Sequence, residues 1–502
     1  MKHLPKISLS MIVKNEAEHL RECLDSVKGI AEEIIIVDTG SADSTVSIAE
    51  EFGASVYFFD WIDDFSAARN YALSKSSGDW ILYLDADERL SKGSAEELKR
   101  ITKGSVLNGY RCIVNSVDDI NGRPKYNRYT RLFSNRPGIK FTGRVHEQID
   151  ESLIENGYSL VDADVEIIHV GYNIPAEHLK KKAERNLVIL KEEYFKNASK
   201  YNAYQLANTY SILDDDVNAR VYYLEAVSGE GLNSEYKAHA YLNLAGYEFK
   251  KHSLDAALGY LQQGLQNDEL NPVLNLLAAD VYFRLNRKED SFLCCISAYM
   301  ANEKIRKEKT VSALTIGIKP EAALCKGIYY SLLASDKARL NYFTAELRKH
   351  NTDLTLLVKK LNGNEALGAE GIKKISGMMS EDNLDAIFLL LENYMDKKTA
   401  LEILLGAVNK FSLNAKYMNT LGLMYYENGM NAEAVRIFEG CLSLEEKDPA
   451  SVFYLISVLI RENKPEKVPE VLLFAEKEFG HIPEFNAKFE ILKEKLGMIF
   501  KG

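Results

Sequence analysis

The chain of 502 residues has little cysteine, and none of its six cysteines stands in the Cys-x-x-Cys spacing of a zinc or redox site. We therefore expect reduced core thiols and no disulfide framework. No apolar run approaches the roughly 18 residues of a membrane helix, so we predict no membrane span. The start reads as a strand and not as a signal peptide. Basic residues, 62 against 73 acidic ones, are too few for a phosphate-following surface, which excludes nucleic acid as an expected partner.

Apolar, β-branched runs alternate with helical periods over residues 1–175. We predict strands at 7–13, 34–37, 55–59 and 81–84, and helices at 16–27, 44–52 and 65–74. Continuous apolar strands between helices are typical of a mainly parallel sheet with helices on both faces. The first part is therefore predicted to be a Rossmann-like α/β domain whose ligands bind beyond the carboxyl ends of the strands.

From residue 176 onward strand signals disappear, and apolar residues recur at helical spacing. Residues 242–249 align with 276–283 at an offset of 34, and Leu421 and Leu455 are equally far apart. A helix–turn–helix period of about 34 residues is the signature of tetratricopeptide (TPR) repeats. We predict an all-α TPR-like solenoid, with a connecting helix at 176–200, TPR-like repeats at 201–305, degenerate helical repeats at 306–410 and C-terminal TPR-like repeats at 411–502.

The strongest candidate site follows the fourth predicted strand, where Asp85 and Asp87 flank Ala86. In an extended chain, residues i and i+2 point to the same side, so both carboxylates could face one cation. Mg²⁺ and Mn²⁺ prefer oxygen ligands and often share them with substrate phosphates. The alternative is a polar strand end that caps the next helix. The place after the fourth strand favours the metal site.

Asp38 ends the second predicted strand and precedes Thr39-Gly40-Ser41. A carboxylate at this place can accept a hydrogen bond from a nucleobase or a ribose. We therefore expect Asp38 to contact a nucleotide.

Four ordered motifs lie in this first part: MIVKNE at 11–16, VDTGSAD at 37–43, DWIDDFSAARN at 60–70 and GDWILYLDAD at 78–87. Together they resemble the family 2, inverting GT-A glycosyltransferases over about a third of the chain. The subgroup with the closest resemblance contains bacterial peptide S-glycosyltransferases of the sublancin type, which carry a TPR-like helical extension. The segments FTGRVHE at 141–147 and IHVGY at 168–172 fit the same subgroup.

The resemblance implies a nucleotide-diphosphate sugar donor, for which we expect UDP-GlcNAc or UDP-Glc, and a divalent cation, Mn²⁺ or Mg²⁺. It implies that Asp85 and Asp87 hold the cation and that His169 serves the cation or the diphosphate, with a purely structural His169 as the alternative. Many relatives have a second Asp where this chain has Thr39, so base recognition should differ. The residues implied to bind the donor are Val13, Asn15, Glu16, Asp38, Arg69, Asp85, Ala86, Arg131 and Arg144.

The catalytic base has two candidates. Many relatives place it in a Glu-Asp pair, whereas this chain has Val145-His146-Glu147. Glu147 can accept the acceptor's proton directly and is the first candidate, with His146 as the second. Alternatively, both only shape the acceptor pocket. Arg131 and Arg144 lie in a stretch without acidic residues, which either binds the donor pyrophosphate or is a solvated loop.

The helical part predicts the class of acceptor. Stacked helix pairs form a concave surface suited to an extended peptide, so we expect a protein or peptide acceptor such as flagellin or a secreted peptide. A cell-surface glycan of the lipopolysaccharide core type is the alternative, and a non-catalytic TPR adaptor is a third interpretation. The same repeats could pair two chains as a homodimer. We expect a cytoplasmic bacterial enzyme.

Overall fold

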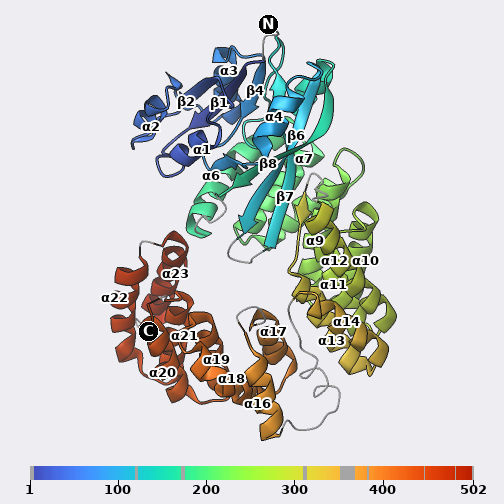
Figure 1. Cartoon of the computed structure of the whole chain (residues 1–502), viewed down its shortest axis with the longest axis vertical. Coiled ribbons are helices and arrows are strands. Elements are labelled where there is room, and N and C mark those ends of the chain that lie inside the picture. Colours follow the sequence, from blue (N-terminus) through green and yellow to red (C-terminus); the bar gives the residue numbers. More distant parts are fainter. Residues whose placement is uncertain are drawn as a thin grey trace. The chain divides into compact units, whose positions relative to one another are not determined.

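A computed structural model of the chain describes residues 5–118, 123–170, 176–308, 314–350, 368–380, 384–445, 447–480 and 482–499 (Figure 1). The chain divides into two compact units. The first comprises Met1–Ile174, Leu179–Leu277 and Ala301–Ile318, and the second comprises Pro175–His178, Ala278–Met300 and Lys319–Gly502. The predicted boundary at residue 175 lies outside the described residues.

One nine-stranded sheet organises the first unit. Its strands are β1 (Ile7–Val13), β2 (Glu33–Asp38), β3 (Ser55–Phe58), β4 (Trp80–Tyr83), β5 (Glu88–Leu90), β6 (Asn108–Asp118), β7 (Arg123–Ser134), β8 (Ser159–His169) and β9 (Thr315–Ile316). The order is β3-β2-β1-β4-β7-β6-β8-β5, with β9 paired to β7. The first four strands are parallel, while β7 joins β4 and β6 antiparallel and β6 pairs parallel with β8.

Helices cover both faces of the sheet, as the alternation of strands and helices predicts. Along β4, Trp80 and Leu82 pack into one core cluster, and Ile81 and Tyr83 into another. Successive strand residues point to opposite faces, so a fully apolar strand needs cover on both sides. The helices of this part are α1 (Leu20–Ser26), α2 (Thr45–Glu51), α3 (Phe65–Lys75), α4 (Ser94–Ile101) and α5 (Asp150–Glu155). The predicted α/β, Rossmann-like class is confirmed.

The rest of the described chain is helical apart from β9. Its α-helices are α6 (Ala176–Lys196), α7 (Lys200–Ile212), α8 (Asp216–Val227), α9 (Ser234–Lys250), α10 (Leu254–Asn267), α11 (Pro272–Arg284), α12 (Lys288–Glu308), α13 (Pro320–Ala334), α14 (Lys337–Arg348), α16 (Ala369–Met378), α17 (Leu384–Tyr394), α18 (Lys397–Phe411), α19 (Ala415–Glu427), α20 (Asn431–Leu442), α21 (Ala450–Arg461), α22 (Val468–Phe479) and α23 (Pro483–Ile499). Consecutive helices pack as pairs, for example α7 with α8, α9 with α10 and α19 with α20. The all-α prediction is confirmed, whereas the inner domain boundaries stay a prediction.

Small residues let the paired helices approach closely. A Cβ added to Gly422 on α19 would lie 2.5 Å from the ring of Phe438 on α20. Gly327 on α13 faces Phe343 on α14 in the same way and at the same separation in sequence. The second pair lies in the segment expected to hold degenerate repeats, so the packing rule of the repeat persists there although its consensus is weak.

No helix in the described ranges combines the length and the apolar character that crossing a bilayer demands. All six cysteines are buried and free, in agreement with the expected core thiols.

Candidate active site

Two cavities in the first unit share one set of residues. The larger has a volume of about 440 Å³ and the smaller about 350 Å³. Arg69, Asp85, His146 and Glu147 line both. A molecule in one cavity can therefore meet a molecule in the other at these four side chains.

Asp85 and Asp87 lie in a turn between β4 and β5. The backbone N–H of Glu88 donates to the carbonyl of Asp85 over 3.0 Å, and the N–H of Asp85 donates to Glu88 Oε2 over 2.9 Å. β4 ends at Tyr83, and the chain then turns instead of staying extended. The expectation of an extended chain at Asp85 and Asp87 is therefore wrong. Both carboxylates still line the larger cavity.

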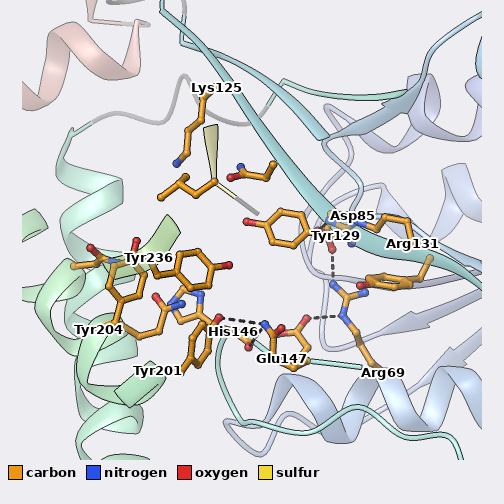
Figure 2. Close-up of a pocket in the computed structure, with 16 residues that line it drawn as sticks. Arg69, Asp85, Lys125, Tyr129, Arg131, His146, Glu147, Tyr201, Tyr204 and Tyr236 are labelled. Atoms are coloured by element: carbon orange, nitrogen blue, oxygen red, sulfur yellow. Dashed lines mark hydrogen bonds and ion pairs between the residues drawn. The ribbon is translucent and has the colours of Figure 1, made fainter. Parts of the chain in front are cut away.

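Arg69, on α3, joins Asp85 to Glu147 (Figure 2). Its Nη2 donates to Asp85 Oδ1 and its Nε to Glu147 Oε1, each over 2.5 Å. The guanidinium lies 5.1 Å from the ring centre of Tyr83, and the side chain is only 7% exposed. Burial alone would raise the pKa of Asp85, but the charges of Arg69 and Arg131 outweigh it and hold that pKa well below its usual range. The charges of the two arginines therefore favour the ionised form of Asp85 at neutral pH.

A short loop presents His146 and Glu147. Thr142 and Gln148 close it through two backbone hydrogen bonds of 2.9 and 2.8 Å. Gly143 turns the chain with a φ of +93°, and His146 has a φ of +56°. A positive φ is costly for a residue with a Cβ, and such strain concentrates at functional sites. The loop brings both candidate bases to both cavities, while their roles stay predictions.

His169 and Asp87 form a second polar pair. β5 pairs antiparallel with β8, which puts Glu88 opposite His169 and leaves Asp87 next to it. His169 Nε2 lies 3.1 Å from Asp87 Oδ2, and its Nδ1 lies 3.3 Å from Ser116 Oγ. Burial alone would lower the pKa of His169, but the hydrogen bond and charge of Asp87 outweigh it and raise the pKa.

Asp87 and His169 are the residues that would hold a divalent cation if phosphates supplied the rest of its shell, and this role stays a prediction. Within the described ranges, no group of three or more His, Cys, Asp or Glu side chains is arranged to hold a metal by itself. Mg²⁺ and Mn²⁺ need only one or two protein carboxylates when phosphates supply the other ligands. Asp85 is already engaged by Arg69 and, over 3.4 Å, by Arg131. Its role as a metal ligand stays a prediction.

Five of the residues predicted to bind the donor line the larger cavity. Besides Arg69 and Asp85 they are Val13, Glu16 and Ala86, which follow or end β1 and β4. Burial, and next the charge of Asp87, raise the pKa of Glu16 to about 7. Glu16 therefore changes charge near neutral pH, inside a cavity that the sequence assigns to an anionic donor.

Asn15 and Asp38 support the loop that follows β2. Asn15 Oδ1 accepts from the N–H of Ala42 over 2.7 Å, and Asp38 Oδ1 accepts from the N–H of Gly40 over 2.9 Å. Asp38 is 2% exposed, and its Oδ2 has no hydrogen-bond partner in the described part of the chain. An unpaired buried carboxylate oxygen is costly, so a donor group on a ligand would stabilise it.

Helix α6 adds cations to the larger cavity that the sequence reasoning missed. Lys182, Arg185 and Asn186 line it. Positions i, i+3 and i+4 of a helix lie on one face. This spacing, on the helix directly after the α/β domain, was the signal that could have found them.

The two other predicted arginines lie elsewhere. Arg131 lines the smaller cavity, is 8% exposed and donates to Glu88 over 2.6 Å. Arg144 lines neither cavity and pairs with Glu192 over 2.6 Å. Contact of either arginine with the donor pyrophosphate stays a prediction that this geometry does not support.

The helical region also forms a wall of the smaller cavity, which the sequence reasoning did not foresee in detail. Its contribution is Tyr201, Tyr204, Gln205 and Asn208 from α7 and Tyr236 from α9. Figure 2 shows Tyr201, Tyr204 and Tyr236 across the cavity from Arg69 and Asp85.

Carboxylates and a cationic face of α6 line the larger cavity beyond the carboxyl ends of the parallel strands, where ligands bind in open α/β sheets. Residues 8–165 match the family described as Glycosyl transferase family 2, so a family 2 glycosyltransferase domain occupies this part of the chain. The GT-A class of the N-terminal fold is thereby confirmed.

Two curated relatives resemble the chain. A TPR repeat-containing protein of Synechococcus elongatus is 46% identical over 154 residues, which cover 30% of this chain and 37% of the relative. The SPbeta prophage-derived glycosyltransferase SunS of Bacillus subtilis is 29% identical over 191 residues, 38% of this chain and 45% of the relative. The matches span less than half of each relative. The predicted resemblance to family 2 and to SunS-type glycosyltransferases is confirmed.

A solved structure, that of TarS from S. aureus, is 16% identical and covers 57% of this chain and 54% of its own, with a TM-score of 0.29. A TM-score this low supports no conclusion about the chain.

Proposed function

We propose that the protein is an inverting glycosyltransferase that moves a sugar from a nucleotide-diphosphate sugar to an acceptor. The observation that carries this proposal is the junction of two cavities at Arg69, Asp85, His146 and Glu147. An in-line displacement needs the leaving group and the acceptor on opposite sides of the anomeric carbon. Two cavities that meet at a shared carboxylate wall support such an arrangement, and the family 2 match supports the reaction class.

The larger cavity is the proposed donor site. Lys182 and Arg185 suit the two phosphates, because cationic side chains make the strongest hydrogen bonds to phosphate oxygens. Asp87 and His169 would hold Mn²⁺ or Mg²⁺. When bound, this cation supplies positive charge against the negative charge that the leaving diphosphate gains.

Glu147 is the proposed base. The acceptor oxygen or sulfur forms its bond to the anomeric carbon while the bond from that carbon to the diphosphate oxygen breaks, with the electron pair leaving on the diphosphate. The acceptor's proton passes to Glu147. Arg69 holds Glu147 Oε1 and so orients the carboxylate. His146, on the same loop, is the alternative base.

The finer assignments belong to the same proposal. We assign UDP-GlcNAc or UDP-Glc as donor and a protein or peptide as acceptor, because the helical region adjoins the smaller cavity and resembles TPR repeats. A homodimer formed through the helical region is included. Six buried, free cysteines are consistent with the reducing cytoplasm of a bacterium.

A glycan acceptor is the second candidate, and the tyrosines and amides of the smaller cavity favour it. The interpretation as a non-catalytic adaptor is disfavoured, because Asp85 and Glu147 line both cavities and Asp87 lines the larger one.

The test is a panel of nucleotide sugars given to the purified protein with and without Mn²⁺, with release of nucleotide diphosphate as the readout. We expect release from one or two donors, dependent on Mn²⁺ and lost in Asp87→Ala. Failure of every donor to bind and to release nucleotide would reject the proposal and favour the adaptor.

A further inference from the structure

The smaller cavity has a lining of unusual chemistry. It combines aromatic rings with neutral amides and is about 350 Å³ in volume, within the range of about 300–1,000 Å³ for small-molecule sites. Among the described residues that line it, the acidic side chains are Asp85 and Glu147, which belong to the shared wall. Beyond that wall the lining is Tyr129, Tyr201, Tyr204, Tyr236, Asn127, Gln148, Gln205 and Asn208, with Tyr83, Leu314, Lys125 and Arg131.

Two tyrosines form a fixed aromatic platform. The rings of Tyr204 and Tyr236 stack with their centres 5.0 Å apart and their planes at 27°. Tyr204 Oη lies 2.9 Å from His239 Nδ1, which fixes the ring further. A nearby ring is also anchored, because Gln148 Nε2 donates to Tyr201 Oη over 3.1 Å. These rings are therefore preorganised to receive a ligand.

The amides offer both hydrogen-bond donors and acceptors to a ligand. Asn127, on β7, is 4% exposed, and its Oδ1 has no hydrogen-bond partner among the described residues. Asn208 Oδ1 already accepts from Tyr223 Oη over 2.7 Å, so a ligand meets mainly its NH₂ group. A buried acceptor without a partner is costly, and a ligand hydroxyl would satisfy it.

An extended peptide fits this pattern less well. An amide that recurred along the repeats would suit an extended peptide. Gln205 corresponds to Asn243 in the next repeat but to Leu277 in the one after, so the amide does not recur. The tyrosines and amides of the smaller cavity come from α7, α9, β7, the end of β4 and the loop of Gln148, and they form one compact site.

We propose that the smaller cavity binds a pyranose ring of the acceptor, either a free glycan or a sugar already attached to a protein or peptide, so that the attacking group is a sugar hydroxyl. The ring's C–H face would pack on Tyr236, because aromatic faces carry negative potential. Its hydroxyls would pair with Asn127, Gln205 and Asn208. The acceptor hydroxyl forms the bond to the anomeric carbon of the donor, its proton goes to Glu147, and the nucleotide diphosphate leaves. This step rests on the proposed function, whereas the binding of a sugar ring does not.

Binding is tested by saturation-transfer NMR on the full chain, with and without UDP. The probes are the methyl glycosides of glucose, galactose, mannose and N-acetylglucosamine. We expect at least one to bind, and Tyr236→Ala to weaken its binding about tenfold. Tyr236→Phe keeps the ring and should stay within about threefold. Binding of none of the four glycosides, or equal binding by wild type and Tyr236→Ala, overturns the proposal.

Tyr260→Ala is the matched control. Tyr260 on α10 stacks on Tyr241 of α9, with ring centres 6.4 Å apart, outside this cavity. The Tyr260→Ala variant therefore loses a similar ring contact of the helical region. We expect this variant to bind the glycoside as tightly as the wild type does.

Transfer is then measured with three acceptors, using mass spectrometry to detect the product. They are the glycoside that binds, a peptide that carries one O-linked N-acetylglucosamine, and the same peptide without sugar. Product on the glycoside or on the sugar-bearing peptide supports the proposal and separates a free glycan from a glycosylated protein. Product on the bare peptide alone, unchanged in Tyr236→Ala, overturns it. If no donor releases nucleotide diphosphate, the proposed function fails, while the NMR result still decides the sugar site.

Discussion

The larger and the smaller cavity share four residues but differ in the rest of their lining. The larger adds ionisable groups, among them Glu16, Asp87, His169, Lys182 and Arg185. The smaller adds mostly tyrosines and amides. Charged groups suit a substrate that gains negative charge during the reaction, whereas neutral rings and amides suit recognition. From this difference we expect substitutions in the larger cavity to affect donor binding, and substitutions in the smaller cavity to affect acceptor binding.

The largest expected effect comes from removing the proposed cation site. Asp87→Ala should lower transfer by about 10³-fold, because the leaving diphosphate loses its positive partner. A chelator should do the same to wild type. Release of nucleotide diphosphate is the measurement, and circular dichroism checks the fold. Asp164→Ala, which removes an exposed carboxylate on β8, is the matched control. Wild-type turnover by Asp87→Ala in chelator would contradict the assignment.

Glu147→Gln should separate the two cavities. A base acts on the acceptor and not on the nucleotide, so transfer should fall about 10²-fold while the donor Kd stays within about twofold. Calorimetry with the nucleotide sugar, beside a transfer assay, measures both. A weaker donor Kd would move Glu147 to the donor side, and retained transfer would leave His146 as the base.

Removing Lys182 and Arg185 together should weaken donor binding about tenfold, because two charge-assisted hydrogen bonds to the diphosphate are lost. The difference should shrink at high salt. Lys180→Ala is the control on the same helix, since Lys180 pairs with Asp214 over 2.6 Å and lines neither cavity. Equal UDP affinity in the double variant and wild type would rule out α6 as a phosphate-binding element.

Gly422→Ala should destabilise the second unit by about 1–3 kcal/mol without changing donor affinity, because its Cβ would meet the ring of Phe438. Gly440→Ala, on α20, adds a Cβ in open space and should stabilise by about 0.5–1 kcal/mol. Urea unfolding of the two variants compares them. If both variants change the free energy of unfolding in the same direction, close helix packing at Gly422 does not determine the effect of the substitution.

The smallest expected effect is a pH dependence at Glu33. Burial alone would raise its pKa, but hydrogen bonds from Ser77 and Ser8 and the charge of Lys6 outweigh it and lower the pKa from 4.5 to about 2. A lowered folded-state pKa stabilises the protein above pH 4.5, and this stability is lost as the pH falls from 4.5 towards 2. Glu33→Gln should remove about 1 kcal/mol of it at pH 6 and almost nothing near pH 2. Urea unfolding at both pH values tests this.

Local pattern predicted the parallel half of the sheet well. The strand expected at 7–13 is β1, and the one expected at 55–59 ends one residue earlier, at Phe58. β1 is buried on both faces, so its apolar run is continuous and easily recognised, whereas β3 is a half-exposed edge strand. The antiparallel pairing of β7 with β4 and β6 was not predicted, because polar and charged residues interrupt the apolar pattern of β6 and β7 and no strand was expected there.

The sequence predicted several residues of the site but not how the structure arranges them. The motifs located Asp85, Asp87, Glu147 and His169, and all four line the larger cavity. The turn after Tyr83 was missed, because it depends on the Glu88 side chain accepting a hydrogen bond from the N–H of Asp85. Lys182 and Tyr236 were missed for another reason. Each is an ordinary helix residue in sequence, and only the tertiary fold brings it to a cavity.

The position of Arg69 has a consequence for the order of events. One guanidinium pairs with both Asp85 and Glu147, and the two carboxylates lie in the wall that the cavities share. Any added positive charge near Asp85 weakens its hold on Arg69 and shifts that cation towards Glu147. Occupancy of one cavity and proton affinity in the other are then thermodynamically linked, and such linkage acts equally in both directions. A donor that binds would tune the base before the acceptor arrives, so a single buried arginine can couple the two substrates without movement of the backbone.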